Sequence, residues 1–211
     1  MRLRAAWPLL GLALAFRAAA QAPESFLDFE EAVEPPHMIL GSLPGGSLMV
    51  TADAGWLRSG VRADIGLSGG FDLNLRVDAF LASDFLSGQD GISLGVRYTP
   101  SYRGLVRFAA EAGVGEVYIP QRFGMDSLFV VRGEMVGALW LGDLGLPYLR
   151  ASARALAFDK TSHSGWGRDA ELGIGWERPV AKIVVGIEGF LWFRAGVPDL
   201  GQWRIRVGIP F

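Results

Sequence analysis

The chain has 211 residues, a formal net charge of −2 and no cysteine. The near-neutral charge argues against nucleic-acid binding, which needs a basic surface, and the lack of cysteine excludes disulfides and thiolate metal sites. Half of the residues are hydrophobic, yet beyond residue 20 no apolar run reaches the 18 or so residues of a membrane helix. Such a chain must alternate or bury its apolar residues, and its 29 glycines and 7 tryptophans suit packed strands with aromatic anchors.

Residues 1–20 have the layout of a secretory signal peptide. Arg2 and Arg4 precede the apolar run AAWPLLGLALAF, and small residues follow it. Cleavage is predicted after Ala20, because the other small-x-small site, ending at Ala22, leaves Pro23 beside the scissile bond. The alternative is an uncleaved N-terminal anchor, although the apolar core is too short to span a bilayer.

Residues 21–46 differ from residues 1–20 in composition, and we interpret them as a solvated acidic leader. Their carboxylates meet no lysine or arginine, and prolines and glycines interrupt any regular element. A flexible linker is favoured over the alternative, which is a helical turn capped by Ser25 and carrying Phe26 and Phe29. Such a turn would pack into or under the mouth of the barrel that is predicted below for residues 47–211. The acidic residues are Glu24, Asp28, Glu30, Glu31 and Glu34, and the breakers are Pro35, Pro36, Pro44, Gly45 and Gly46.

From Ser47 onward, apolar and polar residues alternate with a period of two, which predicts β-strands. The segment 71–81 is the clearest, because Leu73 and Leu75 share one face while Asp72 and Arg76 share the other. Turns rich in glycine, proline and polar residues separate ten such segments. The predicted strands cover residues 47–57, 61–68, 71–81, 92–98, 106–114, 129–140, 148–157, 170–177, 182–191 and 201–211.

An even number of such strands predicts an all-β, closed antiparallel up-and-down barrel over residues 47–211. The tight connection at residues 58–60 leaves eight strands as the alternative. Parity is weakest in residues 129–140, where Val130, Val136 and Trp140 interrupt the polar face. Aromatic residues gather at the strand ends as interfacial girdles do, with Phe71, Tyr98, Trp140, Tyr148, Trp176 and Phe211 at one rim and Trp56, Phe129, Phe193 and Trp203 at the other.

The last strand carries Trp203, Ile205, Val207, Ile209 and Phe211 on one apolar face. This aromatic ending resembles the C-terminal signal strand of bacterial outer-membrane β-barrels, which addresses that family to the barrel assembly machinery. The resemblance implies a Gram-negative outer membrane, contact with its lipid, a periplasmic leader and export by the cleaved signal peptide. The alternative is a soluble antiparallel barrel or sandwich, in which the apolar face points inward.

If the apolar face meets lipid, the opposite face lines the lumen with ten cations and nine anions. A barrel of this size is only just wide enough for side chains to fill it, and each unpaired charge is costly there. We therefore predict a lumen filled by Arg–carboxylate pairs, with a narrow ion or small-solute channel as the alternative. The residues are Asp53, Arg62, Asp64, Asp72, Arg76, Asp78, Arg97, Arg107, Glu111, Arg132, Glu134, Arg150, Arg154, Glu171, Glu177, Lys182, Glu188, Arg204 and Arg206.

The sequence gives little support for a catalytic site. The Ser-His-Ser triplet at 162–164 lies near Asp159 and Asp169, so a hydrolase with a rim site near His163 is a further alternative. The motifs of outer-membrane lipid A deacylases and omptin-type proteases are nevertheless not matched. His37 and His163 make no metal site, and no cofactor is predicted. The prediction is a non-enzymatic outer-membrane barrel with a filled lumen and a structural, adhesive or accessory role through its external loops.

Overall fold

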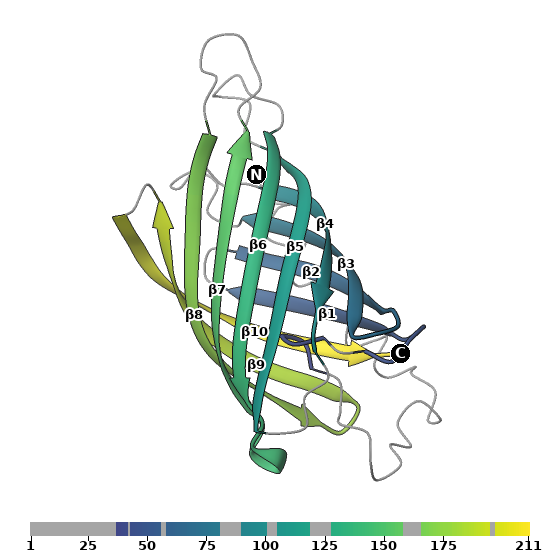
Figure 1. The fold of residues 1–211 in the computed structure, drawn as a ribbon. Coiled ribbons are helices and arrows are strands. Elements are labelled where there is room, and N and C mark those ends of the chain that lie inside the picture. Colours follow the sequence, from purple (N-terminus) through teal and green to yellow (C-terminus); the bar gives the residue numbers. More distant parts are fainter. Residues whose placement is uncertain are drawn as a thin grey trace, which may run out of the picture.

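Ten β-strands follow one another along the chain and close into a barrel (Figure 1). The computed structural model describes residues 37–41, 43–55, 58–80, 90–100, 105–118, 128–157, 166–194 and 197–211. The predicted signal peptide, the leader up to residue 36 and the triplet at 162–164 lie outside the described residues. Within the described residues, no helix is both long and apolar enough to cross a membrane.

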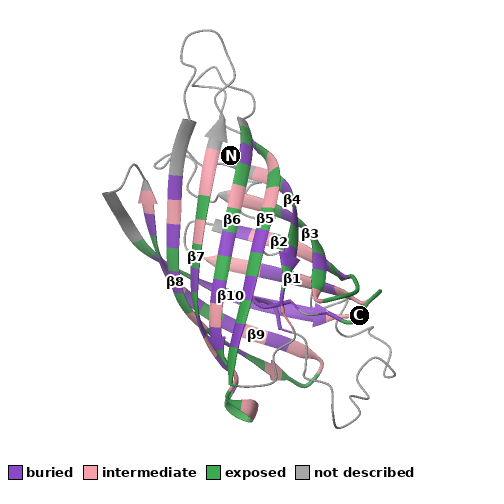
Figure 2. Cartoon of the chain, in the orientation of Figure 1, coloured by how far each residue is buried: buried purple, intermediate pink, exposed green. Residues whose placement is uncertain are grey.

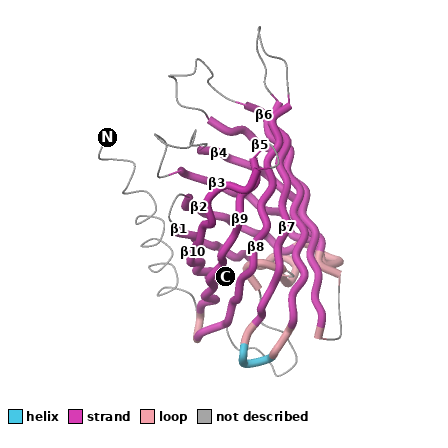
Figure 3. Tube along the Cα trace, turned by 90° about the vertical axis from the view of Figure 1, so that its left-hand side faces the viewer, coloured by secondary structure: helices cyan, strands magenta, loops and turns pink. Residues whose placement is uncertain are grey.

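The strands cover nearly all of the described chain, as Figure 3 shows. A 3₁₀ turn, η3 (Gly142–Leu144), lies between β6 and β7. The strands are β1 (Leu48–Gly55), β2 (Arg58–Gly66), β3 (Phe71–Phe80), β4 (Asp90–Tyr98), β5 (Val106–Tyr118), β6 (Leu128–Leu139), β7 (Leu146–Ala157), β8 (Trp166–Val180), β9 (Ile183–Arg194) and β10 (Val197–Pro210).

Each strand pairs antiparallel with its neighbours in the sequence, and β1 pairs with β10 to close the ring. The closing register sets Val50 opposite Ile209 and Ala54 opposite Ile205. The ten-stranded prediction is confirmed, and the eight-stranded alternative is wrong. We call the end that carries the β2–β3, β4–β5, β6–β7 and β8–β9 connections the turn end, and the opposite end the loop end.

Several strands are longer than the sequence predicted. β8 continues through Arg178 and Pro179, which the sequence placed in a turn, and the chain reverses at Ala181 and Lys182 instead. Ala181 has a φ of 51°, in the left-handed region that tight hairpins require. Pro179 and Val184 are opposite each other near the strand end, where a missing backbone N–H is tolerated.

The apolar face points outward and the charged face inward. On β3, Leu73 and Leu75 are 40% and 41% exposed, whereas Asp72 and Asn74 are 0% exposed. The same alternation of exposed and buried residues runs along most strands in Figure 2. Because a one-residue slip exchanges the two faces, this pattern fixes the register and confirms the predicted sidedness.

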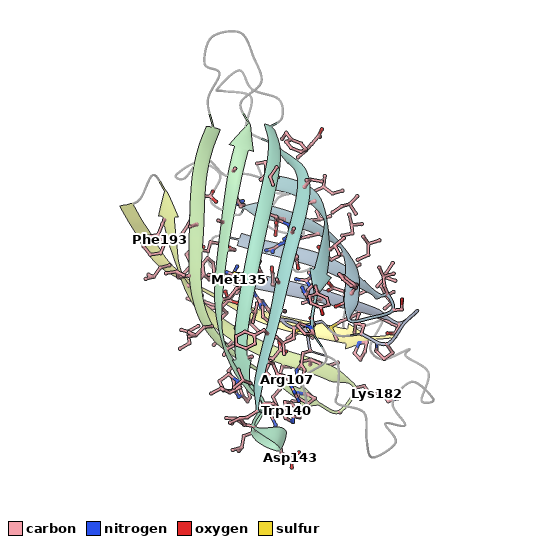
Figure 4. All side chains as sticks on the ribbon, in the orientation of Figure 1. Arg107, Met135, Trp140, Asp143, Lys182 and Phe193 are labelled. Atoms are coloured by element: carbon pink, nitrogen blue, oxygen red, sulfur yellow. The ribbon has the colours of Figure 1, made fainter. Side chains whose placement is uncertain are left out.

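Some residues depart from the predicted faces. Tyr148, placed in the rim girdle, faces the lumen and is buried, because it shares the parity of Arg150 on β7. Trp140, placed beside it, is partly buried against the interior near the turn end (Figure 4). On the apolar face of β10, Trp203 and Ile205 are exposed as predicted, whereas Val207 and Ile209 are buried and Phe211 is half-buried. The other described girdle residues, Phe71, Tyr98, Phe129 and Trp176, are exposed, and Phe193 is half-buried.

Candidate functional site

Glu188 on β9 is the centre of one charge cluster in the lumen. Its carboxylate binds Arg150, Arg204 and Arg206 at 2.8, 2.9 and 2.6 Å, and the Tyr148 hydroxyl donates to it at 2.9 Å. The Glu188 side chain is fully buried. Charge-assisted hydrogen bonds are strong in such an environment, so a single carboxylate ties β7, β9 and β10 together.

Arg150 extends this cluster to two more strands. Its guanidinium donates to Glu134 on β6 at 3.1 Å and to Glu171 on β8 at 2.7 Å, besides its contact with Glu188. The cluster therefore holds three arginines and three glutamates that come from five strands, β6 to β10. Such mutual pairing offsets the cost of burying each charge.

Glu111 on β5 is the centre of a second cluster. It lies 3.0 Å from Arg97, 2.6 Å from Arg132 and 3.4 Å from Arg62. Arg62 also contacts Asp64, two residues along β2, at 2.6 Å. The second cluster thus connects β2, β4, β5 and β6, and the two clusters together span most of the barrel wall.

Further pairs lie closer to the loop end. Arg154 donates to both oxygens of Asp169, at 2.7 and 2.6 Å, and Arg76 donates to Asp78 at 2.9 Å. Asp169, which the sequence placed on the external rim, is therefore paired inside the barrel. The predicted lumen residues are buried or half-buried, and Arg97, Asp72, Glu177 and Glu188 are almost fully buried. Lys182 was wrongly placed there, because it lies in the β8–β9 turn (Figure 4).

Aromatic side chains complete the lining, and sequence reasoning missed two of them. Phe190 and Trp192 share the inward parity of Glu188 on β9 and are buried. The Arg204 guanidinium lies 4.9 Å from the centre of the Phe190 ring, within range of a cation–π contact. Parity along β9 was the signal that could have placed both aromatics inside.

The largest difference from the prediction is that part of the leader lies inside the barrel. Residues 37–41 and Leu43, which we call the inserted segment, are buried at the turn end. The Gly41 N–H donates to the His37 carbonyl at 2.8 Å and closes a tight turn. Gly41 has a φ of 75°, and a Cβ there would collide with Asp72 and Arg97. This turn therefore requires glycine.

Lumen side chains satisfy the backbone of the inserted segment. Arg97 donates to the Met38 carbonyl at 3.3 Å, and Thr99 donates to the Leu40 carbonyl at 2.5 Å. The Ile39 and Leu43 N–H groups donate to Glu177 and Asp72, each at 3.2 Å. His37 Nδ1 lies 3.1 Å from Glu177. Buried backbone groups need such partners, so these lumen charges hold a segment of the chain as well as one another.

The apolar side chains of the inserted segment pack against an apolar patch on the lumen wall. Ile39 and Leu40 form one buried cluster whose wall residues are Ala109, Val136, Ala138, Leu146 and Tyr148. Met38 and Leu43 form another with Met49 and Val184. Val136 is apolar at an inward position of β6 because it belongs to the same buried cluster as Ile39 and Leu40.

A small cavity remains in the lumen beside Met38. Its volume is about 30 Å³, more than the roughly 10–15 Å³ that a cavity needs to hold one water molecule. Thr51 Oγ1 and Arg204 Nε have no hydrogen-bond partner among the described residues. The polar lining consists of Thr51, Asp53, Arg62, Arg76, Arg204 and Arg206.

Comparison with protein-family models gives no match for this chain, and comparison with curated proteins gives none. Comparison with solved structures gives β-barrel proteins of low similarity. The N-terminal β-barrel domain of Pseudomonas aeruginosa OprF is 11% identical with a TM-score of 0.37, covering 79% of this chain and 98% of that one. The NanC porin is 13% identical with a TM-score of 0.44 over 78% and 98%, and the KdgM porin 11% identical with a TM-score of 0.40 over 78% and 99%. At these identities and TM-scores, the likeness carries no conclusion about function.

Proposed function

We propose that the chain is an integral outer-membrane barrel closed by its own side chains, with a structural, adhesive or accessory role through its loop-end connections. The observation that carries this proposal is the filled lumen, in which two arginine–carboxylate clusters span the wall and the inserted segment occupies the turn end. A general diffusion pore needs an open lumen instead.

The outward face supports a membrane location. Leu94, Val114, Met135, Leu149 and Ile174 are between 48% and 68% exposed and belong to a band of apolar side chains that runs around the barrel. Soluble monomers rarely expose apolar patches of this extent. Both ends of the described barrel lie at the turn end, which we assign to the periplasm, and we retain residues 1–20 as an export signal and the apolar face of β10 as an assembly signal.

Leu94 lies midway along β4 and is 53% exposed, so it tests the contact with lipid. Replacing Leu94 by Arg is expected to lower the unfolding free energy in lipid vesicles by about 2–4 kcal/mol, the cost of arginine at the bilayer midplane. Leu144→Arg in η3 is the control, with an expected loss of at most about 1 kcal/mol at the interface. Equal losses in urea titrations of the two variants would contradict a membrane-embedded face.

Conductance tests the closed lumen. In planar bilayers, the purified chain is expected to produce no steady single-channel steps, because charged pairs and the inserted segment fill the path. Heat-modifiable gel migration of the same preparation shows that the barrel is folded. Steady steps from the folded protein would refute the closed lumen and favour the channel.

One observation favours the narrow channel as a second candidate. Four arginines and one aspartate line the small cavity, so a path through it would prefer anions. Reversal potentials in a salt gradient would then show anion selectivity.

We propose no enzymatic role. A hydrolytic activity that disappears in His163→Ala would overturn that view.

A further inference from the structure

An apolar groove lies on the outer face of β5 to β8. Its volume is about 430 Å³, within the roughly 300–1,000 Å³ of known ligand pockets. Leu149 and Ile174, opposite each other on β7 and β8, are 64% and 65% exposed and form part of its wall. The wall also includes Val106, Gly137, Leu139 and Pro147.

Gly137 gives the groove its depth. It is opposite Phe108 on β5, and a Cβ added at residue 137 would have the Phe108 ring as its nearest neighbour, at 3.6 Å. The position therefore accepts a side chain at ordinary contact distance, yet the chain has none there. The result is an apolar depression lined by Gly137, Leu149 and Ile174, on the face that we assign to lipid.

A cation lies just beyond the groove, toward the turn end. On β8, Ile174, Trp176 and Arg178 share the outward parity, and all three are exposed. The Trp176 indole donates to the Leu144 carbonyl at 2.8 Å, which fixes the ring at the rim. Arg178 follows about 7 Å further along the strand. Two of the outward-facing strand side chains whose burial the structure describes are charged, Arg178 and Glu116. Glu116 is near the loop end, so Arg178 is the charged one of the two near the groove.

We propose that this surface is a binding site for one glycerophospholipid, which we call the lipid groove. An acyl chain lies along Leu149 and Ile174 in the depression left by Gly137, and the phosphodiester accepts hydrogen bonds from Arg178. A guanidinium matches a phosphate in charge and in its forked geometry, and the aromatic residue between them is at the level that tryptophan favours in membranes. The inference rests on the proposed membrane location.

The test is lipid retention by the full chain, measured by native mass spectrometry after detergent extraction and during titration with phosphatidylglycerol. Arg178→Gln is expected to weaken binding about tenfold, the loss of one charge-assisted hydrogen bond. Gly137→Leu fills the groove and is expected to weaken it at least as much. The matched controls are Lys182→Gln, a cation in the neighbouring turn, and Gly133→Leu, an exposed glycine on the same strand.

The outcomes distinguish a discrete lipid groove from a uniform lipid coat. Binding that weakens in both groove variants and stays unchanged in both controls supports the site. Equal retention in all four variants overturns it, because lipid then covers the barrel without a discrete site. Binding of glycerol phosphate, which has no acyl chain, with the affinity of the lipid also overturns it. A chain that is water-soluble and not heat-modifiable refutes the membrane location itself, whereas an inserted barrel without selective retention refutes only the groove.

Discussion

Replacing Glu188 by Gln is expected to lower the free energy of unfolding of the barrel by about 3–5 kcal/mol, the typical cost of removing one partner from a buried ion pair. The side chain is fully buried and contacts three arginines. Arg150 keeps Glu134 and Glu171, but Arg204 and Arg206 lose the carboxylate that they share. Urea titration of the barrel in lipid vesicles, followed by tryptophan fluorescence, measures the change.

The control is Glu116→Gln, an exposed residue on β5, with an expected change within about 0.5 kcal/mol. Combining Glu188→Gln with Arg204→Gln should recover part of the loss, since one of the unpaired cations is then removed, and the double-mutant cycle gives the coupling. A loss below about 1 kcal/mol for Glu188→Gln would show that the cluster contributes little to the stability of the barrel.

The strand order and the faces of the barrel could be predicted because the two sides of each strand meet different environments. One side is exposed and apolar, and the other side faces the charged lumen. Outward residues such as Leu73 and inward residues such as Asp72 therefore follow strict parity, and the parity is visible in the sequence. The ends of the strands were less predictable. Arg178 and Pro179 are typical of a turn, but the pairing of β8 with β9 continues past them to Val180.

The partners within the lumen could not be predicted. A near balance of ten cations and nine anions indicated that pairs form, but any inward arginine can approach several carboxylates across a narrow lumen. Glu188 reaches Arg150, 38 residues earlier in the chain, on a strand that is not adjacent to its own. That contact depends on strand tilt and side-chain rotamers, which periodicity does not report.

The inserted segment had a signal that sequence reasoning noted without using. Val136 and Trp140 interrupt the polar face of the strand predicted over residues 129–140, and an apolar residue that faces a charged lumen needs an apolar partner. Met38, Ile39 and Leu40 form an apolar run inside the otherwise acidic leader. Complementarity between these two exceptions was the signal that could have indicated the contact that the structure shows.

Ile39→Asp is expected to release the inserted segment from the turn end. Ile39 is 1% exposed and its apolar cluster includes Val136 and Leu146, so an aspartate there buries an unpaired charge close to Glu177. In this cysteine-free chain, Ala138→Cys supplies a thiol beneath the segment. A polar thiol reagent should label that thiol at least about ten times faster when Ile39→Asp is also present, because each 1.4 kcal/mol of lost segment binding is a factor of ten.

Two further variants decide what a change in labelling means. Leu144→Asp places the same charge in the exposed η3 turn and should leave the labelling rate unchanged. Met38→Cys with Gly208→Cys reports the position of the segment directly, since a Cβ at residue 208 lies 2.5 Å from the Met38 Cγ. We expect the resulting disulfide to form in the otherwise unaltered chain and to fail with Ile39→Asp, while heat-modifiable migration shows the barrel intact. If the disulfide forms equally well in both backgrounds, apolar packing around Ile39 is not what retains the segment, and its other contacts with the lumen side chains hold it in place.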